Sequence, residues 1–268
     1  MFRKGLRFSR LARRVLVCAV GLLAVGAAFS ETLSVGSLVG GSVLAQESPY
    51  PGRRVLTEEE GRRLAEAALS FAEVRYVVRG EAYTGMPYLW GGRSSLEELQ
   101  AAVADINDAV VPVSAPAPAD DGARPDDRQA APESPALPGA LLPAVGVDAS
   151  GVVVNALRTL YPDVRFAATA GDEPTWWADA TSALLYQFNT VHLDPAELRA
   201  GDLVFFGGTV DGEVYVSGVG VVTGRSGTRV DFVVASAREG RVIHTFARTD
   251  GDYWRGNIVG AGRFLVRD

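Results

Sequence analysis

The chain has 268 residues and a formal net charge of −6 at neutral pH, with one cysteine, Cys18, one lysine, Lys4, and two histidines, His192 and His244. So few thiols, amines and imidazoles exclude zinc sites built from Cys and His, Schiff-base chemistry and a disulfide framework, and we expect neither a metal nor another cofactor. An acidic chain lacks the charge that neutralises phosphates, so no nucleic acid partner is expected.

Residues 1–30 have the pattern of a secretory signal. Six basic residues precede an apolar run from Val15 to Phe29, and small residues follow it. Small residues near 30 and again near 45 leave two places for cleavage. Removal of residues 1–30 moves the formal charge from −6 to −12. The pattern predicts export to the periplasm or cell envelope, with membrane contact only through this segment if it stays uncleaved.

The region 46–268 is predicted to form a single domain. Thr57 and Glu60 make a capping box, and apolar residues then recur at helical spacing, which predicts a helix over 58–78. A second helix is possible over 96–110. A stretch rich in Pro, Ala and Asp follows, so we expect a disordered insert at about 97–140, either a tolerated surface insertion or a segment that lies over a groove.

Beyond the insert, two helices and a series of strands are expected. One helix begins at Ala149 and ends near 161, and another spans 176–188. Strands are predicted at 203–206, 216–223, 229–236, 241–247 and 258–266. Helices followed by an antiparallel sheet are typical of the α+β class.

Five sequence blocks carry a resemblance to a known family. Tyr-Leu-Trp-Gly-Gly, Asp-Ala-Ser-Gly and Ala-Gly-Asp-Leu-Val-Phe-Phe are followed by Ser-Gly-Val-Gly and Phe-Val-Val-Ala-Ser, at 88–92, 148–151, 200–206, 217–220 and 232–236. They resemble the NlpC/P60 family of cell-wall cysteine peptidases. The resemblance implies a papain-like fold, with N-terminal helices packed on a C-terminal antiparallel sheet.

The three catalytic positions of the family hold side chains without catalytic chemistry. Ala149 stands at the position of the nucleophilic cysteine, Gly218 at that of the general-base histidine, and Val234 at that of the polar residue that orients the imidazole. A cysteine peptidase needs a thiolate and an imidazole that returns the proton. The sequence therefore predicts a degenerate, catalytically inactive member of the family.

Recognition groups persist beside these positions. The resemblance implies that Tyr88, Asp148 and Ser150 hold the peptide stem of peptidoglycan, with Trp90 in the same block. Three of them also have a structural interpretation, because Asp148 and Ser150 can cap a helix and Trp90 can belong to the core. We expect either a peptidoglycan stem peptide or an envelope protein as partner.

Two other functions stay open. Ser150 with His244 could form a replacement nucleophile and base, although one residue along a helix turns the side chain by about 100°. A purely structural role in the envelope is the third possibility. The aromatic pairs Trp176–Trp177 and Tyr253–Trp254 are expected to anchor the core rather than to bind sugar. An open cleft beside Ala149 favours ligand binding, whereas a filled cleft favours a scaffold.

Overall fold

The computed structural model describes residues 52–108, 142, 144–171 and 173–267. The described residues belong to one compact unit, Glu47–Asp268. The predicted signal segment, its cleavage site and most of the predicted insert lie outside the described residues. No helix in the described part of the chain is long and apolar enough to span a membrane.

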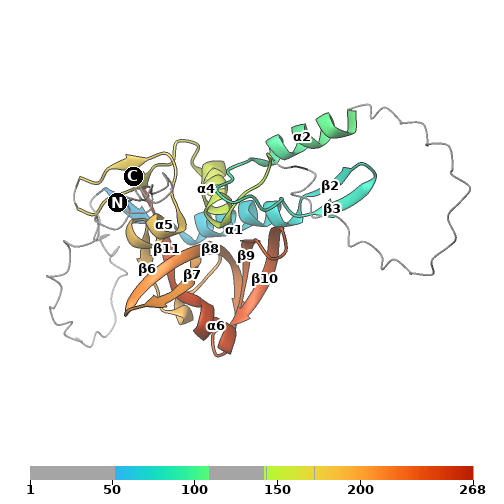
Figure 1. The fold of residues 1–268 in the computed structure, drawn as a ribbon. Coiled ribbons are helices and arrows are strands. Elements are labelled where there is room, and N and C mark those ends of the chain that lie inside the picture. The colour runs from blue at the N-terminus through green and yellow to red at the C-terminus, as the bar shows by residue number, and fades with distance from the viewer. Residues whose placement is uncertain (1–51, 109–141, 143, 172, 268) are drawn as a thin grey trace, which may run out of the picture. The chain divides into compact units, whose positions relative to one another are not determined.

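A seven-stranded antiparallel sheet forms the centre of the molecule (Figure 1). Its strands run in the order β1-β11-β7-β8-β9-β10, and β6 also pairs with β11. The strands are β1 (Arg53–Val55), β6 (Thr190–His192), β7 (Leu203–Val210), β8 (Glu213–Ser226), β9 (Arg229–Ser236), β10 (Arg241–Arg248) and β11 (Ile258–Arg267). All five predicted strands are present. The β7–β8 hairpin is longer than predicted, because its pairing continues to Val210 and Glu213.

Two helices, α1 (Glu58–Glu73) and α4 (Ala149–Leu160), pack against each other and against the sheet. Their apolar sides and one face of the sheet form the main core, which includes Leu64, Leu157 and Val221. A smaller core on other sheet residues includes Phe232 and Trp254, the second from helix α6 (Asp252–Asn257). Helices packed on an antiparallel sheet confirm the predicted α+β class.

The first helix is shorter than the predicted 58–78. It starts at the predicted capping box, where Thr57 Oγ1 accepts from Glu60 N, and it ends at Glu73. The chain then forms a hairpin of β2 (Arg75–Val78) and β3 (Glu81–Thr84). Tyr76 and Val78 are buried in alternation with exposed neighbours, as in a strand. Since Tyr76 also fits the helical spacing, sequence periodicity alone extended the helix too far.

The predicted helix over 176–188 is also shortened. Trp176–Trp177 forms a short strand, β5, paired with β4 (Phe166–Ala167), and helix α5 begins only at Ser182. Thr181 caps it by accepting from Leu184 N. Trp176 lies beside the guanidinium groups of Arg53 and Arg267. Trp177 is half exposed, so the expectation that both tryptophans anchor the core is wrong for Trp177.

Helix α2 (Leu96–Asp108) matches the helix predicted over 96–110 and takes up the first part of the range 97–140. Residues 97–108 are therefore not part of a disordered insert. The helix is ordered by packing, because Leu99 is fully buried and Val103 and Ile106 lie against the main core. Ser95 and Glu98 cap its start reciprocally.

Candidate functional site

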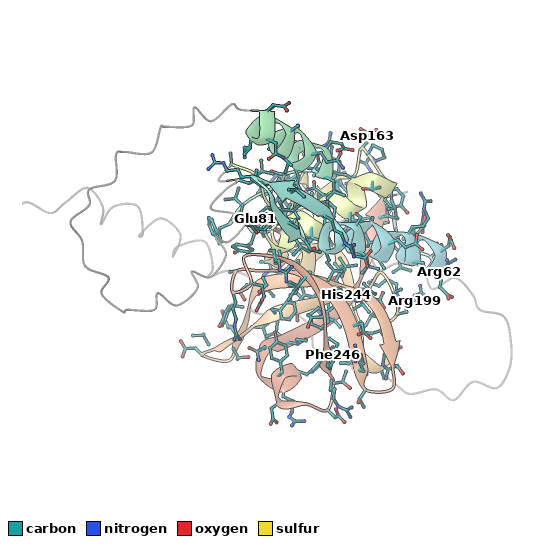
Figure 2. All side chains as sticks on the ribbon, turned by 90° about the vertical axis from the view of Figure 1, so that its right-hand side faces the viewer. Arg62, Glu81, Asp163, Arg199, His244 and Phe246 are labelled. Carbon is teal, nitrogen blue, oxygen red and sulfur yellow. The ribbon has the colours of Figure 1, made fainter. Side chains whose placement is uncertain are left out.

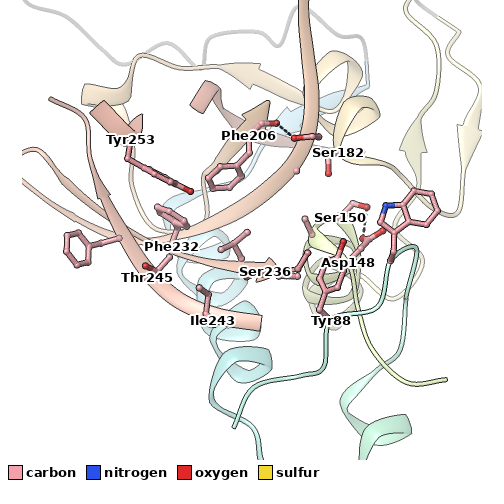
Figure 3. A pocket seen from close by; sticks show the side chains of 18 residues that line it. Tyr88, Asp148, Ser150, Ser182, Phe206, Phe232, Ser236, Ile243, Thr245 and Tyr253 are labelled. Atoms are coloured by element: carbon pink, nitrogen blue, oxygen red, sulfur yellow. Dashed lines mark hydrogen bonds between the residues drawn. The ribbon is translucent and has the colours of Figure 1, made fainter. Parts of the chain in front are cut away.

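A pocket of about 490 Å³ lies between the start of α4 and strands β7 to β10 (Figure 3). A loop before α2, helix α5 and helix α6 complete its walls. All seven site positions predicted from the sequence line it: Tyr88, Trp90, Asp148, Ala149, Ser150, Gly218 and Val234. The fold thus brings together residues that are far apart in the sequence.

The positions predicted for nucleophile and base are direct neighbours. A Cβ atom built on Gly218 would lie 3.8 Å from the Ala149 Cβ and 3.6 Å from the Phe206 Cβ. These are ordinary van der Waals distances, and the Gly218 backbone does not have a positive φ. A side chain at 218 therefore has space, and it would meet residue 149 inside the pocket.

Val234, at the position predicted for the residue that orients the imidazole, lies on the adjacent strand among apolar groups. Val234 of β9 pairs with Ile243 of β10 and packs against the smaller core. The rings of Phe206 and Phe232 lie beside it in the same wall, with centroids 5.6 Å apart. These side chains offer contact surface for apolar groups, and Val234 itself has no polar atom that could orient an imidazole.

The start of α4 is held by an arginine that the sequence reasoning missed. Arg93 Nη1 donates to Asp148 Oδ1 at 2.7 Å, and Arg93 Nη2 donates to Ser150 Oγ at 3.0 Å. Arg93 Nε donates to Asp179 Oδ1 at 2.9 Å. The position of Arg93, directly after the Tyr-Leu-Trp-Gly-Gly block, was the signal in the sequence that could have drawn attention to it.

Asp148 and Ser150 serve the helix start itself. Asp148 is the N-cap of α4, and its Oδ1 accepts from Gly151 N at 2.7 Å and from Ser150 Oγ at 2.9 Å, in addition to Arg93. Ser150 is 4% exposed. Its hydroxyl donates to a carboxylate and accepts from a guanidinium, so Ser150 is fixed in place rather than poised to attack a substrate.

Tyr88 and Trp90 form the rim of the pocket next to α4. Tyr88 N donates to Gly240 O at 2.8 Å, which ties the loop to the turn just before β10. Burial raises the pKa of the Tyr88 hydroxyl, and the Asp148 carboxylate raises it further, so this hydroxyl stays a donor at neutral pH. Trp90 is 86% exposed, so it does not belong to the core.

The histidines lie away from this pocket. His244 is exposed on β10 (Figure 2) and its Nε2 lies 2.8 Å from Thr223 Oγ1, while His192 stacks on the ring of Tyr186. Neither is among the described residues that line the pocket. Ser150 and His244 are therefore not brought together as a nucleophile and base. No group of three His, Cys, Asp or Glu residues in the described ranges could hold a metal ion.

Several lining residues were not predicted from the sequence. Tyr253, expected in the core, is 56% exposed and faces the pocket from α6, whereas its neighbour Trp254 is buried as expected. The hydroxyl groups of Ser217, Ser236 and Ser182 also belong to the lining. In Figure 3, Ser150 and Ser182 lie on one side of the pocket, and Tyr253, Phe206 and Phe232 lie on the other.

The sequence matches no protein-family profile and no curated protein. Among solved structures, the chain is similar to a protein described as similar to a lipoprotein of the NLP/P60 family, from Staphylococcus aureus subsp. aureus Mu50. The identity is 16%, the TM-score is 0.38, and the match covers 80% of this chain. This chain spans only 44% of that protein's length.

Proposed function

We propose that this protein is an exported NlpC/P60-like pseudoenzyme, which binds a cell-wall peptide or a protein partner in the pocket beside Ala149 without hydrolysing it. The observation that carries the proposal is the contact distance of 3.8 Å between the Ala149 Cβ and a Cβ at position 218. Two positions predicted separately from sequence motifs meet in one pocket, as a nucleophile and its base must. Neither carries a reactive group.

The chemistry of the neighbouring groups supports the absence of hydrolysis. A peptidase needs a nucleophile, a base within hydrogen-bond reach, and a proton donor for the leaving amine. Ala149 and Gly218 supply none of these. Ser150, the alternative nucleophile, already donates to Asp148 Oδ1, and both histidines are outside the lining. We therefore favour binding over hydrolysis by Ser150.

The open pocket favours binding over a purely structural role. A scaffold that had lost its ligand would be expected to fill the vacated space with larger side chains, since close packing is the rule in protein interiors. Here the positions of nucleophile and base hold the two smallest residues, and about 490 Å³ stays open beside them. Exposed Trp90 and Tyr253 border that space.

A hydrolysis assay on the purified protein tests the proposal. We expect no cleavage of a synthetic stem peptide by the wild type, by Ser150→Ala, or by Ala149→Cys, because the thiol in the last variant still lacks a base. Cleavage by the wild type would contradict the proposal. If that cleavage disappeared in Ser150→Ala, the serine alternative would be correct.

A second experiment tests whether positions 149 and 218 have the geometry of a nucleophile and base. We would compare Ala149→Cys with the double variant Ala149→Cys, Gly218→His by alkylation with iodoacetamide over a range of pH. A nearby imidazolium stabilises the thiolate, so alkylation of the double variant should begin at lower pH. Identical pH profiles would mean that the two side chains do not meet.

Binding is tested by comparing the wild type with a variant whose pocket is filled, Gly218→Leu. We would titrate both calorimetrically with purified peptidoglycan fragments and use both as bait for envelope proteins. A ligand of the pocket should bind the wild type and not the filled variant. If every ligand bound both equally, the pocket would not be the binding site.

A further inference from the structure

We propose that the ligand of this pocket is an uncharged, extended segment of a partner protein, which inserts one bulky apolar side chain over Gly218. This inference rests on the proposed function and narrows it. It chooses a protein segment over a charged wall peptide. The argument uses the pocket's apolar wall, its balance of charge, and the exposed aromatic side chains that line it.

The wall around Gly218 is suited to an apolar side chain. Gly218 exposes strand backbone flanked by Phe206, Val234 and Ala149, and a Cβ added there would meet these surroundings at 3.6 Å or more. An engineered cavity of about 150 Å³ is enough to hold benzene. The pocket, at about 490 Å³, has room for a leucine or phenylalanine side chain and part of the adjoining backbone.

The charges of the pocket disfavour an ionic ligand. Asp148 is the one charged residue among the described residues of the lining, and its Oδ1 is already paired with Arg93 at 2.7 Å and accepts from Gly151 N and Ser150 Oγ. The guanidinium groups of Arg93 and Arg229, which contact lining residues, are already paired: Arg93 with Asp148 and Asp179, and Arg229, which stacks on Phe246, with Asp231. A carboxylate in this pocket would lose water without meeting a cationic side chain among the described residues of the lining, which is costly.

The neutral polar groups suit a peptide backbone. Hydroxyl groups of Tyr88, Ser217 and Ser236 stand around the apolar wall. Ser217 Oγ already donates to Phe206 O, so it can accept from a peptide amide, and Ser236 Oγ already accepts from Glu239 N, so it can donate to a peptide carbonyl. Trp90, in the loop before α2, and Tyr253, on α6, are 86% and 56% exposed, and both line the pocket. Exposed aromatic side chains beside a concave apolar surface are typical of the anchors of protein interfaces.

The chain offers a matched pair of variants for the test. Gly218→Leu fills the pocket with a side chain at ordinary contact distances. Gly224→Leu adds the same side chain on the same strand, at a position where nothing lies within 4 Å and which is not in the lining. A second pair changes exposed tyrosines inside and outside the pocket, Tyr253→Ser and Tyr215→Ser. Since both tyrosines are half exposed, this pair does not depend on how the core tolerates a larger residue.

The probes are acetylated and amidated pentapeptides that differ only in the central residue: Gly, Leu, Phe, Lys or Glu. Calorimetry, supported by tryptophan fluorescence, gives their affinities. We expect Leu or Phe to bind about tenfold to a hundredfold more tightly than Gly, because one apolar side chain leaves water. Lys and Glu should bind no better than Gly.

The variants should separate the pocket from the rest of the surface. Gly218→Leu should lose the preference for the Leu and Phe probes, and Gly224→Leu should keep it. Tyr253→Ser should weaken the binding of these probes more than Tyr215→Ser does.

The outcomes separate this inference from the proposed function. Absence of a preference for Leu or Phe at millimolar peptide would overturn the inference. Tighter binding of a charged stem peptide than of the Leu and Phe probes, lost in Gly218→Leu, would also overturn it while leaving the proposed function intact. Cleavage of a probe by the wild type would overturn the proposed function. Self-association of the wild type that Gly218→Leu abolishes would identify a second copy as the occupant and contradict the partner protein.

Discussion

The two ends of the pocket are built on different principles. At the start of α4, the polar side chains of Asp148, Ser150 and Arg93 satisfy one another and cap the helix. On the sheet side, the apolar side chains of Phe206 and Val234 form a wall. Polar residues in this pocket therefore do not by themselves indicate a ligand, because Asp148 and Ser150 also hold the start of α4.

The largest change in the free energy of unfolding is expected from a disulfide that joins the two ends of the pocket, at positions 149 and 218. The double variant Ala149→Cys, Gly218→Cys should form a disulfide on oxidation, because the two Cβ atoms would lie 3.8 Å apart, at the mean separation in disulfides. Closing a loop of roughly 70 residues should raise the free energy of unfolding by about 4 kcal/mol relative to the reduced form. Urea denaturation with and without reductant measures this. Two thiols that stay free under oxidising conditions would show that the ends do not meet.

The next largest change in the free energy of unfolding should come from the polar side chains at the start of α4. Arg93→Met leaves Asp148 and Asp179 without their cation, and since Asp148 is largely buried, we expect a loss of about 3 kcal/mol in unfolding free energy. Arg248→Met is the matched control, because Arg248 forms an exposed pair with Asp250. That control should leave the urea midpoint unchanged. Equal midpoints for the wild type and Arg93→Met would mean that the network does not hold the helix start.

A smaller effect is expected from the serine inside this network. Ser150→Ala removes a buried hydroxyl that donates to Asp148 and accepts from Arg93, so it should cost about 1 kcal/mol of stability. Ser217→Ala, an exposed serine at the sheet end, should cost nothing measurable. Thermal melting compares the two. A larger loss in Ser217→Ala would reverse the contrast drawn between the ends.

The smallest effect concerns the Tyr88 hydroxyl at the rim. Its pKa is raised by burial and, second, by the Asp148 carboxylate, which repels a phenolate. Asp148→Asn should therefore lower this pKa toward that of free tyrosine without reaching it. The ultraviolet absorbance of tyrosinate gives the titration, with Tyr88→Phe subtracted. A pKa that stays unchanged in Asp148→Asn would place the carboxylate too far from the ring to matter.

Short-range sequence patterns predicted much of the secondary structure of this protein. The capping box of Thr57 and Glu60, the helix that starts at Ala149 and the five sheet strands follow from spacing and cap chemistry that act over a few residues. The motif order also identified the seven site positions that line one pocket. The predictions were wrong where one sequence pattern fits two structures. Tyr76 fits the spacing of a helix and of a strand, and it lies in β2. Trp176–Trp177 pairs with β4 instead of starting a helix.

Tertiary structure alone decided how the site is organised. Arg93 meets Asp148 and Asp179 across 55 and 86 residues of sequence, and Tyr253 faces the pocket while its neighbour Trp254 is buried. Such pairings depend on which strands and helices pack together, which no local period encodes. The sequence by itself determined that residues 149 and 218 carry no thiol and no imidazole. Only the fold determined that these positions are neighbours, and that the space beside them stays open, with apolar and hydroxyl-bearing side chains around it.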